Sequence, residues 1–463
     1  MPSDPSAALD YLATHRQRHR DDLIALLRIP SVSTDPAHQA DVRACAGWLA
    51  AHLRDIGLPT VEVLPTAGHP VVYAEWLGAP GRPTVLIYGH YDVQPAEPLE
   101  LWATPPFEPT IRDGQIYARG ATDDKGQFFT HVKAVEALLA TAGRLPVNVK
   151  FLIEGEEEIG SVNLAPVIEQ YRDRLAADVA VVSDTPMFGR GQPSLCYGLR
   201  GLVYLEITVT TAGRDLHSGQ YGGAVPNPIL ALAHLLSACK TPDGRITVPG
   251  FYDEVAPLTP AERESLAALP FDEAALRRDL ELAALPGEPG YTTLERLTAR
   301  PTLDANGIWG GFTGAGSKTV IPCQAHAKLS CRLVPDQDPA VIAGRIEAHL
   351  HAACPPGARV AVRRLGLAEP VLTPLDHPAT QAAARALEAA YGVAPFFTRE
   401  GGSIPVVATF RRLLNLPTVL VGFGLPDEPL HAPNERFDLD NYERGACTSV
   451  LLLHELAALA ADD

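Results

Sequence analysis

The sequence lacks an excess of positive charge and has no long apolar run. Asp and Glu total 55 against 38 Lys and Arg, so the formal net charge is −17. This negative field does not attract nucleic acid or an anionic membrane surface, and we expect neither as a partner. No apolar run approaches the roughly 20 residues of a transmembrane helix. Residues 1–22 also lack the apolar centre of a signal peptide.

Cysteine is scarce, and its spacing excludes two kinds of structure. The seven cysteines are scattered along the chain and form no Cys-x-x-Cys motif. An odd, scattered set argues against a disulfide framework and against a structural zinc site. We therefore expect buried free thiols, a reducing compartment and a cytoplasmic location.

The length and the order of apolar segments predict an α/β protein. A chain of 463 residues is long enough for two or three domains with a large core, and internal repeats and low-complexity tracts are absent. Short runs rich in Val, Ile and Leu alternate with helical periodicity, which predicts a mostly parallel sheet flanked by helices. The expected helices are 6–28, 37–56, 126–142 and 162–172, and the expected strands are 70–77, 84–90, 148–154 and 178–183.

The pattern changes near residue 200, which predicts an inserted domain. Residues 202–209 include several β-branched residues and are partly polar, as in an antiparallel strand. Residues 241–312 are expected to be irregular except for a helical patch near 260–285. The remaining expected elements are a helix at 226–239, strands at 325–334 and 358–364, and helices or strands at 377–392, 404–414, 418–423 and 439–460. We predict a catalytic domain from residues 1–200 and 368–463, interrupted by an α+β domain at 201–367.

Acidic residues and histidines follow several of the apolar runs. TVLIY precedes Gly89-His90-Tyr91-Asp92, VKFLI precedes the acidic run Glu154–Glu158, VAVVS precedes Asp184, and TVLVGFG stands shortly before His431. In open α/β sheets the ligand crevice lies at the carboxyl ends of the strands. One sheet edge would therefore collect two imidazoles and several carboxylates. Such a concentration of negative charge is costly unless cations are bound there.

Each of these residues also has an ordinary structural interpretation. His90 and Asp92 point to the same side of an extended chain, which suits a metal-binding His oriented by a carboxylate but also a structural pair. Asp123 precedes a predicted helix and complements its dipole. The Glu156–Glu158 run resembles a solvated acidic stretch. Taken together, however, the residues favour a metal site, and their donor types suit zinc, manganese or cobalt better than magnesium or calcium.

Five motifs, in this order and spacing, resemble one enzyme family. They are GHYDVQ, ARGATDDKGQ, EGEEEIGS, DLHSG and HAPNE. The set is similar to the co-catalytic metallopeptidase family of aminoacylase, succinyl-diaminopimelate desuccinylase, glutamate carboxypeptidase and carnosinase-type dipeptidases. The resemblance covers nearly the whole chain. The length of the insert and the string GSKTVIP…CRLVPD are most similar to the cytosolic nonspecific dipeptidase branch.

This resemblance implies a centre of two divalent metal ions in each subunit, with zinc favoured and manganese or cobalt as alternatives. Asp123 would bridge the ions, His90 and Asp184 would complete one site, and Glu158 and His431 the other. An Asp at position 184 is typical of the aminopeptidase and dipeptidase branches. Asp92 would orient His90, and Glu157 would be the general base that activates a metal-bridging water.

The resemblance also implies roles for residues of the insert and beyond it. The insert would be a lid and dimerisation domain, and His217 would reach the partner subunit's active site in a homodimer and stabilise the oxyanion. Arg332 would bind the α-carboxylate of the substrate, a planar task suited to guanidinium. Thr319 and Ser403 are further candidate substrate contacts.

Three functions are consistent with these residues. The first is a metal-dependent dipeptidase that acts on small peptides with a free C-terminal carboxylate. The second uses the same two-metal site to hydrolyse N-acyl or N-carbamoyl amino acids. The third is a catalytically silent metal- or peptide-binding protein, which would require the loss of a ligand or the base. The length of the insert and Asp184 favour the dipeptidase. The native metal, the side-chain preference and the acceptance of longer peptides do not follow from the sequence.

Overall fold

The structure is a computed structural model that describes residues 4–402 and 404–459. The chain divides into two compact units. The core unit comprises Met1–Tyr197, Thr373–Thr398 and Pro405–Asp463, and the inserted unit comprises Gly198–Leu372 and Arg399–Ile404. The insert expected from the sequence spans 201–367, so the inserted unit begins three residues earlier, ends five residues later and includes a second, short segment.

The main sheet has nine strands, and its central strands are parallel. Their order is β1-β2-β6-β3-β7-β17-β8-β15, with β16 also paired to β8. The pairs β6–β3, β3–β7 and β7–β17 are parallel, whereas β1–β2, β2–β6, β17–β8 and β8–β15 are antiparallel. The strands are β1 Thr60–Leu64, β2 Val71–Trp76, β3 Thr84–His90, β6 Asn148–Glu154, β7 Val179–Val182, β8 Ser194–Leu199, β15 Val371–Leu372, β16 Phe396–Glu400 and β17 Thr418–Leu420. The predicted α/β class with a parallel centre is confirmed.

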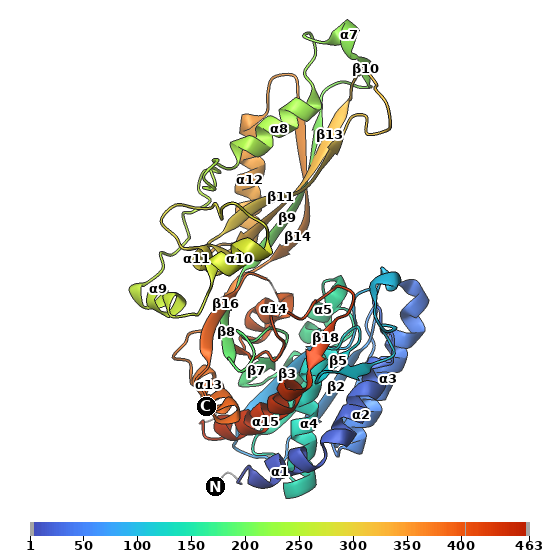
Figure 1. The fold of residues 1–463 in the computed structure, drawn as a ribbon, viewed down its shortest axis with the longest axis vertical. Coiled ribbons are helices and arrows are strands. Elements are labelled where there is room, and N and C mark those ends of the chain that lie inside the picture. The colour runs from blue at the N-terminus through green and yellow to red at the C-terminus, as the bar shows by residue number, and fades with distance from the viewer. Residues whose placement is uncertain (1–3, 403, 460–463) are drawn as a thin grey trace. The chain divides into compact units, whose positions relative to one another are not determined.

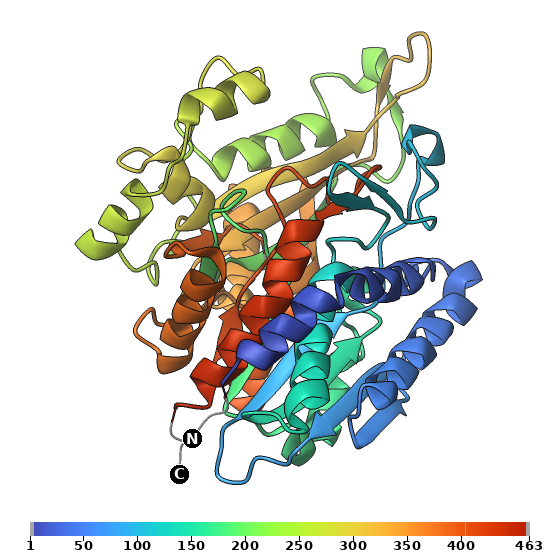
Figure 2. The same cartoon turned by 60° about the horizontal axis from the view of Figure 1, so that its bottom comes forward.

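The central strands are parallel because they can be buried on both faces. Every residue of β6 and of β7 is buried, as expected for apolar strands covered by helices on each side. Helix α3 packs on β1 and β2, while α4 contacts α1, α2 and α15. Figure 2 shows α4 and α15 running side by side along the sheet. The helices are α1 Ser6–Thr14, α2 Arg16–Leu27, α3 Gln39–Asp55, α4 Lys125–Ala142, α5 Leu164–Gln170, α6 Arg172–Leu175, α13 Pro378–Tyr391, α14 Pro405–Leu414 and α15 Leu439–Leu456.

One continuous helix was expected at 6–28, but this segment forms two helices, α1 and α2. The prediction of a single helix was therefore wrong. His15 separates α1 from α2 with φ −108° and ψ 17°, outside the helical range. Its ring nitrogen Nδ1 lies 2.9 Å from the carbonyl oxygen of Tyr11. A side chain that bonds a carbonyl of the preceding turn competes with the helical ladder. The apolar periodicity alone does not reveal such a break.

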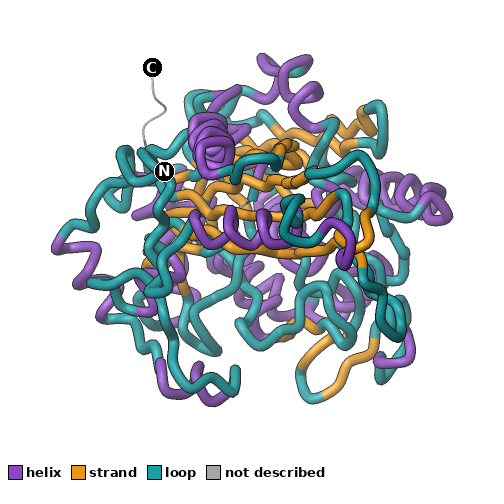
Figure 3. Tube along the Cα trace, turned by 90° about the horizontal axis from the view of Figure 1, so that it is seen from above, coloured by secondary structure: helices purple, strands orange, loops and turns teal. Residues whose placement is uncertain are grey.

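The first and last helices of the core unit lie together. Helix α1 contacts α15, and both helices can be followed in Figures 1 and 2. Figure 3 distinguishes the helices, strands and loops of the described chain by colour. A short sheet of β4 (Thr110–Arg112), β5 (Gln115–Tyr117) and β18 (Arg436–Asp438) also joins the two sequence segments of this unit. The core unit is therefore completed by the C-terminal part of the chain.

The inserted unit is an antiparallel sheet covered by helices. Its order is β11-β13-β9-β14, and α8 and α12 pack against it and against each other (Figure 1). Residues of β9 and β13 alternate between buried and half-buried, which matches a sheet with one covered face. The elements are β9 Gly201–Thr210, β11 Thr302–Gly310, β13 Gln324–Leu333, β14 Arg359–Ala368, α8 Pro228–Ala238, α9 Pro260–Ala267, α10 Glu273–Asp279, α11 Thr293–Thr298 and α12 Pro339–Ala353. β10 (Leu216–His217) and β12 (Val320–Ile321) form a separate two-stranded antiparallel sheet, and α7 (Ser218–Tyr221) directly follows β10.

Strand β11 lies within residues 241–312, which were expected to be irregular around a helical patch. Its sequence, TLDANGIWG, contains two glycines and three polar residues, and its pairing with β13 is interrupted between Ala305 and Gly307. Gly, Asp and Asn are depleted in strands, so local sequence gives little strand signal here. Pairing with the apolar strand β13 imposes the extended conformation. The helical patch itself is confirmed as α9 and α10.

Two further observations concern the whole described chain. The seven cysteines are all free. Every helix among the described residues is too short or too polar to cross a membrane. Neither observation contradicts the expectations drawn from composition.

Candidate metal centre

The candidate ligands follow neighbouring strands of the main sheet. His90 is the last residue of β3, Glu158 lies in the short 3₁₀-helix Glu157–Ile159 after β6, and Asp184 stands two residues beyond β7. Asp123 precedes α4, and His431 lies between β17 and β18. Because β6, β3 and β7 are adjacent and parallel, their carboxyl ends open at one edge of the sheet.

Two groups of side chains in this region share a single carboxylate. Ligand atoms of His90, Asp123 and Asp184 lie within 4.8 Å of one another, and so do those of Asp123, Glu158 and His431. Asp123 Oδ1 is 3.1 Å from His90 Nε2, and its Oδ2 is 2.8 Å from His431 Nε2. His431 Nε2 is also 3.3 Å from Glu158 Oε2. Each oxygen of Asp123 thus faces one group, which is the arrangement of a carboxylate that bridges two cations.

The two imidazoles and Asp123 form a strongly coupled set. Burial opposes the protonation of His90, but Asp123 and Asp92 outweigh it and raise the pKa of the imidazole well above its usual range. The hydrogen bond to Asp123 raises the pKa of His431 to about 9. Burial would raise the pKa of Asp123, but bonds from His431 and His90 lower it. Without cations, protons on the imidazoles therefore supply the positive charge that the carboxylate requires.

The remaining carboxylates are held in a medium that disfavours their charge. Burial, followed by the charge of Asp123, raises the pKa of Glu158 to about 8 and raises that of Asp184 well above its usual range. Burial also raises the pKa of Glu157. A bound dication reverses this effect, because it stabilises the ionised carboxylates. Positive ions bound in this cluster would therefore stabilise the ionised forms of its carboxylates.

The donors present fit two divalent cations. The groups offer one imidazole and two carboxylates each, with Asp123 common to both. Within the described residues, Glu158 Oε1 is buried and has no hydrogen-bond partner, which is unusual unless a cation is its partner. Nitrogen and oxygen donors of this kind bind zinc and neighbouring transition metals.

Asp92 connects the two strand ends that carry these ligands. His90 Nδ1 lies 3.1 Å from the backbone oxygen of Asp92 and 3.4 Å from its Oδ1. The Asp92 carboxylate accepts the backbone N–H groups of Glu157 and Glu158 at 3.2 and 3.1 Å. Its position suits the orientation of His90 Nε2 toward a metal. It also fixes the turn that presents Glu157 and Glu158.

Glu435 positions the loop of Asp123, and the sequence analysis gave it no role. This fully buried carboxylate accepts bonds from Arg119 Nη1 at 2.7 Å and from the backbone N–H groups of Gly120, Thr122 and Asp123 at 2.9, 3.0 and 3.2 Å. Its place in HAPNE, four residues after His431, was the available signal. These hydrogen bonds connect the 119–123 loop, which carries the shared ligand Asp123, to the segment that carries His431.

Gln94 supports a second ligand and was also missed. Its Nε2 donates to Glu158 Oε2 at 2.7 Å, which leaves Oε1 of the same carboxylate without a partner in the described part of the chain. Gln94 follows His90 and Asp92 in the motif GHYDVQ. Such an amide contact directs one carboxylate oxygen and leaves the other for a metal.

The residues expected to contact substrate lie in the inserted unit or outside the described residues. His217 pairs with Val320 in the two-stranded sheet of β10 and β12, and Thr319 directly precedes Val320. The Gly219 N–H donates to His217 Nδ1 at 3.0 Å, so a neutral His217 carries its proton on Nε2. Arg332 lies on β13, half-buried, and burial lowers the pKa of its guanidinium. Ser403 lies outside the described residues.

Comparison with known proteins gives full-length matches. The chain is 33% identical to the Cys-Gly metallodipeptidase of Schizosaccharomyces pombe, covering 98% of this chain and 99% of that protein. It is 34% identical to the human Beta-Ala-His dipeptidase, covering 99% and 94%. The crystal structure of human carnosine dipeptidase 1 matches with a TM-score of 0.83 at 32% identity, covering 99% of this chain and all of that one.

A family model also matches most of the chain. The match extends from residue 86 to residue 455 and therefore includes all five candidate ligands, the inserted unit and the core unit from residue 86 onward to residue 455. A metallo-carboxypeptidase of Sulfolobus solfataricus, Sso-CP2, is described as a member of the M20 family and matches with a TM-score of 0.85 at 35% identity, covering 95% of this chain and 99% of that one. The chain belongs to peptidase family M20/M25/M40.

Proposed function

We propose that the protein is a metal-dependent dipeptidase that hydrolyses small peptides with a free C-terminal carboxylate. The observation that carries this proposal is the shared carboxylate of Asp123 between two His- and carboxylate-containing groups. Full-length similarity at 33–34% identity to two dipeptidases supports the same substrate class. Two divalent cations held by this set would supply Lewis-acid activation of water and of the scissile carbonyl. We favour zinc, with manganese or cobalt as alternatives.

Glu157 is the proposed general base. It follows Glu156 in the turn after β6 and precedes the ligand Glu158, and its backbone N–H is fixed by Asp92. A carboxylate in this buried position would accept the proton of the attacking water and deliver it to the leaving amine. Asp92 would act by orienting His90 rather than by contacting substrate.

His217 and Arg332 are proposed to act on the substrate. The N–H at His217 Nε2 is available to donate to a developing oxyanion because Nδ1 already accepts a bond from Gly219. Arg332 would bind the C-terminal carboxylate, with Thr319 and Ser403 as further contacts.

We also propose a homodimer in which His217 completes the partner's site, and exposed Leu230, Ile308 and Trp309 would supply apolar contact area. A cytoplasmic location is consistent with seven free thiols.

The alternative is an amidohydrolase for N-acyl or N-carbamoyl amino acids with the same two-metal site. A panel that pairs free dipeptides with the matching N-acetyl and N-carbamoyl amino acids distinguishes the two. The protein would be loaded with zinc or manganese in turn, and amino acid release would be measured. We expect turnover mainly of the dipeptides. Turnover mainly of the blocked amino acids would move the protein to the amidohydrolase branch.

Two variants test the mechanism within this panel. Glu157→Ala should abolish turnover while both metals remain bound, whereas Glu169→Gln, an exposed substitution on α5, should act as wild type. Activity in trans is tested by mixing Glu157→Ala with His217→Ala. If His217 acts across the dimer, mixed dimers regain one complete site and activity returns. No recovery after subunit exchange would contradict the trans arrangement.

A further inference from the structure

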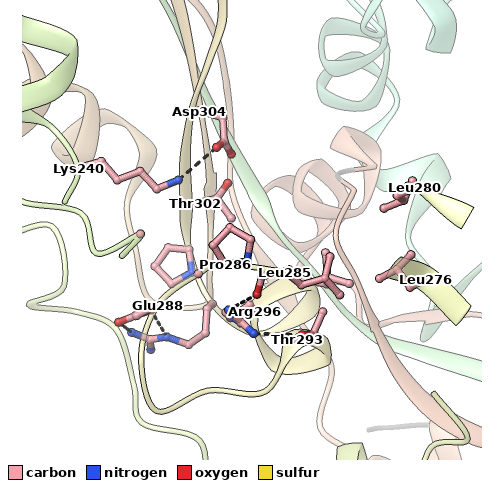
Figure 4. A pocket seen from close by; sticks show the side chains of 15 residues that line it. Lys240, Leu276, Leu280, Leu285, Pro286, Glu288, Thr293, Arg296, Thr302 and Asp304 are labelled. Atoms are coloured by element: carbon pink, nitrogen blue, oxygen red, sulfur yellow. Dashed lines mark hydrogen bonds and ion pairs between the residues drawn. The ribbon is translucent and has the colours of Figure 1, made fainter. Parts of the chain in front are cut away.

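The inserted unit contains a cavity that the metal centre and the proposed substrate contacts do not use. Its volume is about 290 Å³, near the lower limit for small-molecule sites. The wall is formed by α10, α11, the 285–288 loop and the first part of β11. The apolar residues that line it are Leu276, Leu280, Leu285, Pro286, Leu297 and Pro301. In Figure 4, Leu276 of α10 and Leu280, directly after this helix, lie across the space from Leu285 and Pro286.

One charged group in the wall has only neutral partners. Arg296 donates to the carbonyl oxygens of Thr292 and Leu285 at 3.3 and 3.2 Å and to Thr293 Oγ1 at 3.0 Å. Within residues 4–402 and 404–459, it makes no ion pair with a carboxylate. A guanidinium beside an apolar cavity and without a counter-ion is a ready anchor for a carboxylate.

The other charged residues of the wall are paired. Arg300 binds both oxygens of Glu288, at 2.8 and 2.9 Å, and this pair is buried. Lys240 donates to the carbonyl of Leu303 at 3.0 Å and lies 3.3 Å from Asp304 Oδ1 (Figure 4). Arg296 is therefore the charged residue of the cavity wall that has no oppositely charged partner among the described residues.

The position of Arg296 depends on a neighbouring glycine. A methyl group at Gly287 would lie 2.6 Å from both Cδ and Nη1 of Arg296, which is too close. Gly287 itself stands against Gly244, whose own added methyl group would lie 2.9 Å from the Gly287 Cα. Because Gly244 and Gly287 have no side chains, the Arg296 guanidinium can lie close to the 285–288 loop.

The cavity wall is also connected to the proposed carboxylate anchor of the active site. Thr302, which lines the cavity, pairs with Arg332 across β11 and β13, and its Oγ1 accepts the Arg332 backbone N–H at 3.4 Å. Two residues earlier, the carbonyl of Arg300 accepts a bond from Arg200 Nη1 at 3.3 Å. A ligand that shifts residues 300–302 would therefore act on the backbone that carries Arg332.

We propose that this cavity is an effector site for a small carboxylate with a branched or aromatic apolar group. The carboxylate would bind Arg296, and the apolar group would fill the space among the leucines. Free apolar amino acids belong to this class, and they are the products that a dipeptidase releases. The regulatory part, a change in the KM for peptide through Thr302 and Arg332, rests on the proposed function, whereas the binding itself does not.

Calorimetry on the metal-loaded, full-length protein tests the site with 4-methylpentanoate and its uncharged amide. We expect the carboxylate to bind with a Kd in about the millimolar range, which is usual for so small a ligand. The amide and the Arg296→Gln variant should each lower affinity about tenfold, the scale of one lost charge-assisted contact. Arg278→Gln, exposed on α10 and outside the cavity wall, is the matched control and should bind as wild type.

Two further measurements locate the ligand and separate the outcomes. Hydrogen exchange should slow within residues 276–304 when the carboxylate is added. Gly287→Ala, which retains the arginine but displaces it, should weaken binding as Arg296→Gln does. Undiminished binding in Arg296→Gln, equal binding of the amide, or the absence of binding overturns the proposal. Binding without a change in KM overturns its regulatory part. If no peptide is hydrolysed at all, the proposed function fails while the calorimetric result stands.

Discussion

Among the described residues of the core unit, two clusters have the geometry of a metal site, and the two differ in whether a lysine or arginine lies within them. Asp22, His52 and Glu136 also present ligand atoms within 4.8 Å of one another. The Lys133 ammonium occupies this cluster, 2.6 Å from Asp22 Oδ2, 2.9 Å from His52 Nε2 and 2.9 Å from Glu136 Oε2. The Asp123 centre contains no lysine or arginine in an equivalent position among the described residues.

The two clusters have similar ligand geometry, so the balance of charge distinguishes the structural cluster around Lys133 from the candidate metal centre around Asp123. Burial alone would raise the pKa of Glu136, but Lys133 and Arg18 lower it to about 2, so this carboxylate is ionised without a metal. Burial raises the pKa of Glu158 to about 8, so that carboxylate requires an added cation. Both clusters contact the same helix, because α4 begins after Asp123 and carries Lys133.

The strongest test removes the shared ligand. Asp123→Asn keeps the size of the side chain and halves its capacity to bridge two cations. We expect kcat/KM for a dipeptide to fall by about a thousandfold or more, or about 4 kcal/mol in transition-state stabilisation. Metal content measured after dialysis should fall below two ions per subunit. Retention of both ions and of activity would contradict the role given to Asp123.

The matching test removes the resident cation of the other cluster. Lys133→Met leaves Asp22 and Glu136 without their buried partner, which costs about 3–5 kcal/mol for a pair of this kind. We expect a large drop in the free energy of unfolding in urea, whereas the metal content of the Asp123 centre should not change. Lys318→Met, an exposed substitution in the inserted unit, should alter stability very little. Loss of metal in Lys133→Met would show that the two clusters are not independent.

A third test uses pH. Burial, followed by the charge of Lys133, lowers the pKa of both His19 and His52 to about 4. The unfolded chain therefore takes up protons between about pH 6.5 and 4 that the folded chain does not, and stability falls as the pH falls through this window. We expect a loss of about 3 kcal/mol from each of these two groups. His52→Gln should flatten the dependence of unfolding free energy on pH, whereas His351→Gln on the exposed face of α12 should leave it unchanged.

The smallest effect is expected at Gln94. Its hydrogen bond orients Glu158, so Gln94→Ala should weaken the site of Glu158 and His431 while sparing that of His90 and Asp184. Loss of such a supporting contact typically reduces metal affinity about tenfold. Titration with a competing chelator should show one weakened ion and one unchanged ion. Equal weakening of both ions would indicate that the centre responds as a unit.

The sequence predicted the parts of the molecule whose signal is local. Apolar strands β3, β6 and β7 are buried on both faces, so they appear as continuous runs, and the polar residues after them were visible for that reason. The structure brings the five predicted ligands together. Strand β11 could not be predicted from its glycines and polar residues, because pairing with β13 imposes its conformation.

The supporting residues could not be predicted because their partners are distant in the sequence. Glu435 accepts bonds from the 119–123 loop more than 300 positions earlier in the chain, with separations of 312 to 316 residues. Lys133 meets Asp22 from 111 residues away. No periodicity encodes such contacts. A helical lysine is usually solvated, and its burial becomes evident only when the acidic groups around it are in place.

The distance along the chain between Asp123 and His431 also sets the timing of assembly. These two residues are 308 positions apart in the sequence. Domains generally fold as the chain leaves the ribosome, from the N-terminus onward. A nascent chain can gather His90, Asp123 and Asp184, yet it cannot complete the second group until the segment that carries His431 has been synthesised. A chain truncated before residue 431 therefore lacks a member of the second group and would not hydrolyse peptides by the proposed two-metal mechanism.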